Sequence, residues 1–190
     1  MKGLLFMKLK LLFFGFIFVM FLAITSPILA QADLYPIPST IAPSPIEYAL
    51  PYPGILSDHP LYFLKVLRDR ILLFFTQDQV KKIQYKLLFA DKRLVAGQLL
   101  FEQGKKDVAI DTITKGEKYL LDSAAEVAEM KRQDVPPGLT DKIELSAKKH
   151  EEVIKALSNV GNNADTEKRL SDALGLTHQA FAQIAQFKQK

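Results

Sequence analysis

The sequence predicts an all-α protein, an antiparallel helical bundle of about five helices that follows a signal segment and a proline-rich linker. From residue 58 onward, apolar residues recur at intervals of three and four, which is the period of a helix, and no strand-like alternation occurs there. Glycine, proline and asparagine interrupt this pattern at a few short breaks. Because short connections favour antiparallel neighbours, we expect residues 58–190 to form one bundle domain.

Residues 1–32 have the layout of a secretory signal peptide. Lysines precede an unbroken apolar run over residues 11–24, and small residues stand before a cut at Asp33. The alternative is an uncleaved anchor, with residues 9–30 tethering the chain to a membrane. A 14-residue apolar run spans only about 21 Å as a helix, short of a ~30 Å hydrocarbon core. Either way, we predict an extracytoplasmic protein, secreted or membrane-anchored.

Residues 33–57 form a linker that is dense in proline and contains no Lys or Arg. Proline fixes φ and donates no hydrogen bond, so we expect an extended, polyproline-like segment. At ~3.1 Å per residue it would reach roughly 80 Å and hold the domain away from a membrane or wall. A proline-rich ligand for a partner domain is the alternative.

The first helix combines apolar, aromatic and basic residues. We expect Ser57 or Asp58 to cap it and Pro60 to lie in its first turn. Arg70 interrupts a broad apolar arc that lies opposite Lys65, Arg68 and Asp69. The arc consists of Leu61, Leu64, Leu67, Ile71, Phe74 and Phe75. We interpret this helix as the centre of the bundle; the alternative is a helix that lies on a membrane surface.

A helix at the centre of the bundle would bury Arg70. A lone buried charge is costly, so Arg70 would then need an acidic partner, such as Asp91.

The second helix should run from Asp78 to about Gln103. Its apolar positions follow a coiled-coil seam of three heptads, with small residues at Ala90 and Gly97 that would let a neighbouring helix approach closely. Gly104 is typical of a helix C-terminus.

Three further helices are expected. They run from about Asp107 to Gln133, from near Thr140 to Val160, and from a cap at Asp165 or Thr166 onward.

The composition and motifs argue against an enzyme. The chain has no cysteine, and its three histidines occur in no metalloprotease or di-iron motif. No nucleophile elbow and no phosphate-binding glycine loop occurs either. We therefore expect no catalytic residue, cofactor, metal or small-molecule substrate. His150 lies on the apolar stripe of its helix, and we expect it to be hydrogen-bonded and partly buried. Glu151 and Glu152 should pair with nearby lysines on a solvated face.

The charge balance argues against nucleic-acid binding. The first 32 residues hold three of the 25 basic residues and none of the 21 acidic ones, which leaves 22 basic against 21 acidic residues. The high isoelectric point therefore gives little support for a nucleic-acid partner.

Two sequence blocks resemble a family catalogued as domain of unknown function 5667, found in predicted exported or membrane-linked proteins of bacteria. The resemblance covers roughly residues 50–130. The first block matches at Leu61, Tyr62, Leu64 and Lys65. The second block matches at Ala90, Arg93 and Leu94, with Asp91 in place of the usual glutamate and with Ala96 and Gly97 where the family has glutamate and alanine.

The resemblance implies a helical exported domain and supplies no activity. The matched residues suit one of two roles. They could hold the first two helices together, with Tyr62 packed on the second helix and Lys65 or Arg93 paired with a carboxylate, or they could form a recognition surface. We therefore predict a non-enzymatic domain that binds another cell-envelope component, a protein or a polymer. The alternative is a peripheral binder of membranes or anionic polymers that uses the basic first two helices. The candidate interaction residues are Tyr62, Lys65, Arg68, Arg70, Asp91 and Arg93.

Overall fold

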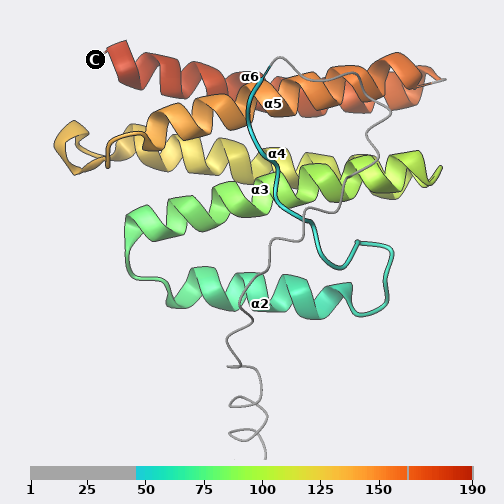
Figure 1. The fold of residues 1–190 in the computed structure, drawn as a ribbon, viewed down its shortest axis with the longest axis horizontal. Coiled ribbons are helices and arrows are strands. Elements are labelled where there is room, and N and C mark those ends of the chain that lie inside the picture. The colour runs from blue at the N-terminus through green and yellow to red at the C-terminus, as the bar shows by residue number, and fades with distance from the viewer. Residues whose placement is uncertain (1–45, 162, 190) are drawn as a thin grey trace, which may run out of the picture. The chain divides into compact units, whose positions relative to one another are not determined.

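The computed structural model describes residues 46–161 and 163–189, and most of these residues are helical (Figure 1). The elements in chain order are α2 (Tyr62–Phe75), α3 (Gln79–Glu102), α4 (Lys106–Glu129), the 3-10 turn η1 (Arg132–Asp134), α5 (Leu139–Val160) and α6 (Ala164–Gln189). The predicted class, an all-α fold of about five packed helices, is confirmed over this part of the chain. The predicted signal segment, residues 1–32, lies outside the described residues.

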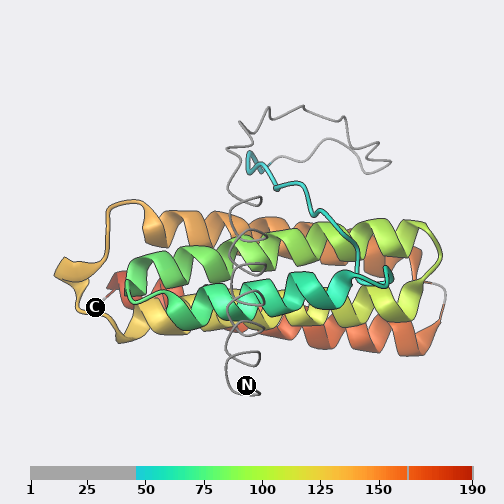
Figure 2. The same ribbon diagram turned by 90° about the horizontal axis from the view of Figure 1, so that it is seen from below.

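Helices α3 to α6 form a four-helix bundle. Around the bundle the order is α3, α4, α6, α5, and helices that follow one another in the chain run antiparallel (Figures 1 and 2). Two separate apolar clusters fill its interior. One cluster includes Ile83, Leu120, Ile143 and Ile184. The other includes Leu94, Ile110, Ile154 and Leu170.

Helices α3 and α4 approach closely because glycine lies at their contact. A Cβ added to Gly97 would stand 2.3 Å from Cγ1 of Ile113 and 2.9 Å from the carbonyl oxygen of Ala109. A Cβ added to Gly116 of α4 would come within 3.1 Å of the Ala90 carbonyl oxygen. The predicted close approach of a neighbour at Ala90 and Gly97 is therefore confirmed.

Helix α3 has the expected residues at both of its ends. The Asp78 carboxylate accepts a hydrogen bond from the Lys81 amide (3.0 Å) at the start of α3. At its end, Gly104 adopts a positive φ of 79°, and the Lys105 amide bonds back to the carbonyl of Leu100. The cap of α6 differs from the prediction, because the Asn163 side chain, rather than Asp165 or Thr166, accepts from a backbone amide, that of Thr166 (2.7 Å).

The start of α2 also differs from the prediction. The helix begins at Tyr62, so Pro60 precedes it, and neither Ser57 nor Asp58 caps it. Tertiary contacts engage these two side chains instead: Ser57 bonds the Thr112 hydroxyl (2.6 Å), and Asp58 pairs with Lys105.

The predicted place of the first helix at the bundle centre is wrong. Helix α2 lies outside the four-helix bundle, next to α3 alone (Figures 1 and 2). The residues of its apolar arc are exposed: Leu61, Leu64, Leu67, Ile71, Phe74 and Phe75. The proposed partnership of Arg70 with Asp91 is also wrong, since Arg70 is exposed and Asp91 is buried among other partners.

The segment that enters the domain packs against the bundle. Residues 46–57 fall within the predicted linker, yet Leu50 and Leu56 pack on the second apolar cluster and Pro53 is buried. Tyr48 reaches the interior, where its hydroxyl donates to Asp91. We call residues 46–57 the strap. The predicted boundaries of the signal segment and linker stay predictions.

Candidate functional site

A layer of polar side chains crosses the bundle between its two apolar clusters. Each bundle helix contributes to it, and the strap adds one hydroxyl. We call this group the polar layer. Its members are Tyr48 of the strap, Asp91 of α3, Glu117 of α4, Ser146 and His150 of α5, and Thr177 of α6.

His150 is the hub of the polar layer and is fully buried (0% exposed). Its Nδ1 lies 2.8 Å from Glu117 Oε1, and its Nε2 lies 3.1 Å from Asp91 Oδ1. The predicted hydrogen-bonded histidine on the apolar stripe is confirmed, and its burial is complete rather than partial.

The two carboxylates take their remaining hydrogen bonds from hydroxyl groups. Tyr48 and Ser146 each donate to Asp91 at 2.7 Å. Thr177 donates to Glu117, also at 2.7 Å. Because both carboxylates are supplied with donors, the polar layer is a satisfied network of the kind that fixes helix register.

The electrostatics of the polar layer favour a protonated imidazole. Burial alone would lower the pKa of His150, but the negative charge of Glu117 and the hydrogen bonds to Asp91 and Glu117 raise this pKa to about 9. Burial, followed by the charge of Asp91, raises the pKa of the Tyr48 hydroxyl, which therefore stays a donor.

A buried ion pair holds α2 against α3 and fixes its rotation. Asp69 is only 1% exposed, and its carboxylate lies 2.8 Å from an Arg68 nitrogen and 3.5 Å from Nη2 of Arg93. The longer distance is that of an ion pair rather than a hydrogen bond. Arg93 also donates to the Phe89 carbonyl (3.2 Å), and its guanidinium lies 4.5 Å from the Tyr119 ring centroid. Asp69 therefore faces the bundle, and α2 cannot turn about its axis without leaving the buried guanidinium of Arg93 unpaired.

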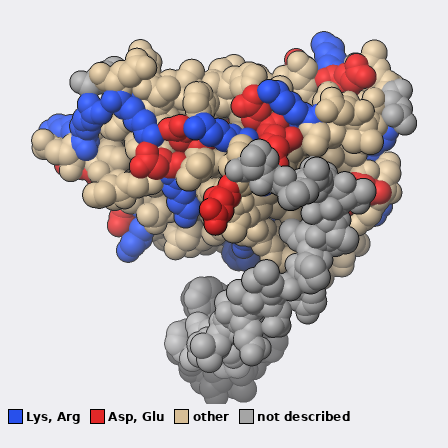
Figure 3. All heavy atoms as spheres, turned by 45° about the horizontal axis from the view of Figure 1, so that its top comes forward, with Lys and Arg blue, Asp and Glu red and all other residues tan. Residues whose placement is uncertain are grey.

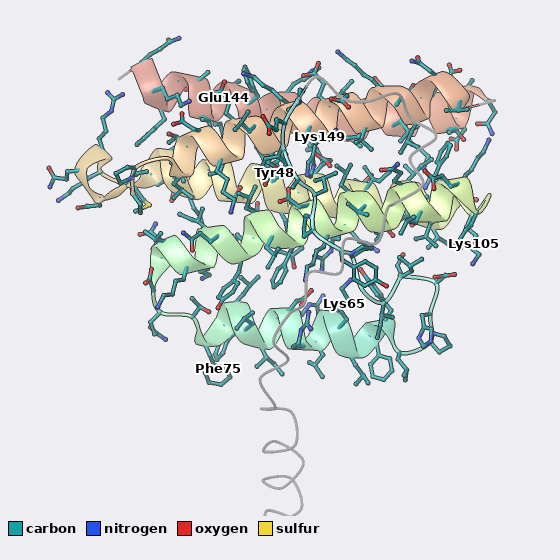
Figure 4. All side chains as sticks on the ribbon, in the orientation of Figure 1. Tyr48, Lys65, Phe75, Lys105, Glu144 and Lys149 are labelled. Carbon is teal, nitrogen blue, oxygen red and sulfur yellow. The ribbon has the colours of Figure 1, made fainter. Side chains whose placement is uncertain are left out.

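With its acidic side chain held inward, α2 presents apolar side chains to solvent. Phe74 is 78% exposed and Phe63 is 62% exposed. Figure 4 shows Phe75 pointing away from α3, whereas Lys65 points toward it. We call this surface the α2 face; it consists of Leu61, Phe63, Leu64, Leu67, Ile71, Phe74 and Phe75. The surface over α5 and α6 looks different, since basic and acidic side chains alternate there (Figure 3). Two of its pairs, Lys155 with Glu151 and Lys149 with Glu152, confirm the predicted solvated face.

A basic pocket adjoins the α2 face. Its volume is about 360 Å³, and Lys65, Arg68 and Lys92 surround it above the backbone of residues 53–55. Leu64 of the α2 face lines it as well. Lys65 donates to the carbonyls of Pro53 (2.7 Å) and Ile55 (3.1 Å). Burial, followed by the positive charge of Arg93, lowers the pKa of Lys65 to about 8. The three basic side chains have one nearby carboxylate, that of Asp69, so the pocket carries a net positive charge.

The structure distributes the six predicted interaction residues over separate places. Asp91 belongs to the polar layer, and Arg93 belongs to the ion pair with Asp69. The other four lie on α2: Lys65 and Arg68 line the basic pocket, while Tyr62 and Arg70 line a second, shallower groove on the other side of the helix.

Sequence reasoning missed several residues that matter here. One group is Glu117, which bonds His150, and Thr177, which donates to Glu117; they come from other helices than His150, and no local spacing links them to it. Asp69 was placed correctly opposite the apolar arc, but the pattern did not show that this side faces α3. Lys92 carried no signal of its own.

The described part of the chain holds no group of His, Cys, Asp and Glu side chains arranged to bind a metal ion. Every helix in this described part is too short or too polar to cross a membrane.

The fold and these surfaces define a class: a four-helix domain braced by a central polar layer, with one outlying amphipathic helix. The chain belongs to the family described as a domain of unknown function (DUF5667), whose model matches residues 54–164. The predicted family is thereby confirmed, and the match extends beyond the predicted region through α5. No curated protein and no solved structure shows significant similarity to the chain.

Proposed function

We propose that this protein is a non-enzymatic, extracytoplasmic domain that binds another component of the cell envelope through the α2 face. The observation that carries the proposal is the orientation of α2, which buries its acidic side chain against the bundle and turns the apolar side chains of the α2 face to solvent. The layout of residues 1–32 as a signal peptide supports a place outside the cytoplasm.

The α2 face is suited to binding because it is built into the fold. Soluble monomers rarely display contiguous apolar patches of this kind unless the patch meets a partner. Rotating α2 to bury the face would carry Asp69 to solvent and away from Arg93, and the buried guanidinium of Arg93 would lose its carboxylate partner. The exposed face is therefore the stable arrangement, and a partner would cover it.

The polar layer supports a role without catalysis. His150 and its two carboxylates are the group in the described residues that most resembles acid–base machinery, yet His150 is fully buried and its nitrogens are both engaged. Such a group holds helices together and meets no substrate. A lipid or anionic-polymer partner is the alternative to a protein, and Arg68 and Arg70, both exposed beside the apolar side chains, favour it.

Site-specific photocrosslinking in cells tests the proposal. The full chain would carry a photoreactive amino acid at Leu67 of the α2 face or, as a matched control, at exposed Gln179 of α6. We expect covalent products with an envelope component from Leu67 and none from Gln179. Equal yields from the two positions, or products with cytoplasmic proteins alone, would contradict the proposal.

Substitution at the same face gives a second measurement. Replacing Leu67 with Ser should change the free energy of unfolding, measured with urea, by no more than about 0.5 kcal/mol, because the side chain is half exposed. In the same variant, crosslinks from a photoreactive amino acid placed at neighbouring Phe63 should nevertheless be lost.

A further inference from the structure

We infer that the α2 face docks on the surface of a lipid bilayer that contains anionic phospholipid, with lipid phosphates drawn to the basic pocket beside it. This inference rests on the proposed function and names the envelope component as the membrane itself.

The first support is the shape of the face. Helix α2 has 14 residues, so it is about 21 Å long, and its exposed apolar side chains extend along it from Leu61 to Phe75. Such a helix lies in the plane of the interface and buries one face roughly 5–10 Å into the headgroup and acyl boundary. The bundle lies on the opposite side of α2, so it does not obstruct this approach (Figures 1 and 4).

The second support is the sign of the charges at the face. Arg68 and Arg70 are exposed on α2, and the only acidic residue of the helix, Asp69, is turned inward and paired. Lipid phosphates complement two outward arginines, whose apolar stems also lie comfortably along acyl chains.

The third support is the basic pocket. Lys65, Arg68 and Lys92 line it, and buried Arg93 lies close to Lys65. Burial, followed by the positive charges of Arg93, Lys92 and Arg68, lowers the pKa of Lys65, and the one carboxylate of Asp69 opposes this only in part. An anion in the pocket would relieve this repulsion. Leu64 belongs to both the pocket and the α2 face. A phospholipid whose phosphate occupies the pocket would therefore have its acyl chains along the apolar side chains of the α2 face.

A second copy of the chain fits the face less well. Two α2 faces packed on each other would bring arginines from both copies together without an outward carboxylate to neutralise them. The apolar run over residues 11–24 also brings the chain to a membrane during export, or keeps it there if it stays uncleaved.

A polarity-sensitive fluorophore on single cysteines tests the inference in the full chain. The natural sequence has no cysteine, so one introduced thiol reports one position. Phe63→Cys and Phe74→Cys place the probe on the α2 face, and Gln179→Cys places it on exposed α6 as the control. The local readout separates insertion of α2 from any membrane contact of residues 9–30.

Vesicles of phosphatidylcholine, with and without phosphatidylglycerol, are the ligands. We expect the emission from positions 63 and 74 to shift to the blue as the phosphatidylglycerol fraction rises, and the emission from position 179 to stay constant. The double change Arg68→Gln and Lys92→Gln should weaken the response by about tenfold or more, because each basic residue near the surface contributes about a fivefold preference. Lys142→Gln with Lys168→Gln, exposed on α5 and α6, is the charge-matched control and should have no effect.

The outcomes separate the inference from the proposed function. A probe whose emission is already blue-shifted without vesicles and unchanged by them would overturn the lipid assignment in favour of another copy or segment of this chain. An unchanged, solvent-like emission together with protein crosslinks from Leu67 in cells would overturn the lipid assignment and leave the proposed function standing. An unchanged emission without any crosslink would overturn both.

Discussion

At the scale of single residues, the protonation of His150 is the central physical feature of this protein. A neutral imidazole could donate to only one of its two carboxylates, whereas an imidazolium donates to both Asp91 and Glu117. The protonated ring also leaves one net negative charge in the polar layer instead of two. The cost of burying the ring is offset by these interactions, which is why its pKa is raised to about 9.

The raised pKa predicts that stability falls as pH rises through neutrality. The unfolded histidine loses its proton near pH 6.5, and the folded one keeps it until about pH 9. The stabilising contribution is therefore complete below pH 6.5 and is lost between 6.5 and 9. The slope is about 1.4 kcal/mol per pH unit, or roughly 2 kcal/mol between pH 6.5 and 8. Urea unfolding at these two pH values measures it.

The same prediction has a direct spectroscopic control. A His59→Gln and His178→Gln variant leaves His150 as the one remaining histidine, and its imidazole should titrate near pH 9 by NMR. The lowered pKa of Lys65, about 8, makes stability change in the opposite sense above pH 8, so the stability comparison ends at pH 8. An imidazole that titrates near 6.5, with a flat stability profile, would refute the assigned protonation state.

At the scale of elements, the contact between α3 and α4 depends on the absence of side chains. We expect Gly97→Ala to lower the free energy of unfolding by about 1–3 kcal/mol, because the new methyl would overlap Ile113 and the backbone of Ala109. Gly175→Ala in α6 is the matched control, since a Cβ there meets nothing within 4 Å. That change should stabilise by up to about 1 kcal/mol through helix propensity. Urea unfolding of both variants measures these changes. A Gly97→Ala protein more stable than the natural one would contradict the close contact between α3 and α4.

Local sequence patterns predict where the helices lie in the chain but not how α2 is oriented on the bundle. The helices were predictable because the apolar period, Gly104 and the Pro136–Gly138 break are local signals. The outward orientation of α2 was not predictable, because its pattern shows which side is apolar but not which side meets the bundle. Asp69 and Arg93 decide that question, and they are 24 positions apart on different helices. The polar layer was hidden for the same reason: one of its members, His150, was marked by its place on an apolar stripe, and its partners lie on other helices.

At the scale of the whole described molecule, the strap and the polar layer connect the chain's entry to the centre of the bundle. In the strap, the Tyr48 hydroxyl donates to Asp91, and Leu50 and Leu56 pack on the second apolar cluster. Lys65 of α2 donates to the backbone carbonyls of Pro53 and Ile55 in the strap. The strap therefore links the polar layer to α2.

This connection predicts that a single hydroxyl near the start of the strap contributes to the stability of the whole domain. Removing it with Tyr48→Phe should lower the free energy of unfolding by about 1.5–3 kcal/mol, because a hydrogen bond to a buried carboxylate is lost and the carboxylate stays buried. Tyr52→Phe, four residues later and 72% exposed, is the matched control and should change nothing measurable. Urea unfolding gives the free energies, and hydrogen exchange of the amides around His150 locates the effect. If the two variants have the same free energy of unfolding, the strap packs on the bundle without stabilising the polar layer. If Tyr48→Phe alone speeds exchange of the amides around His150, the strap is part of the core.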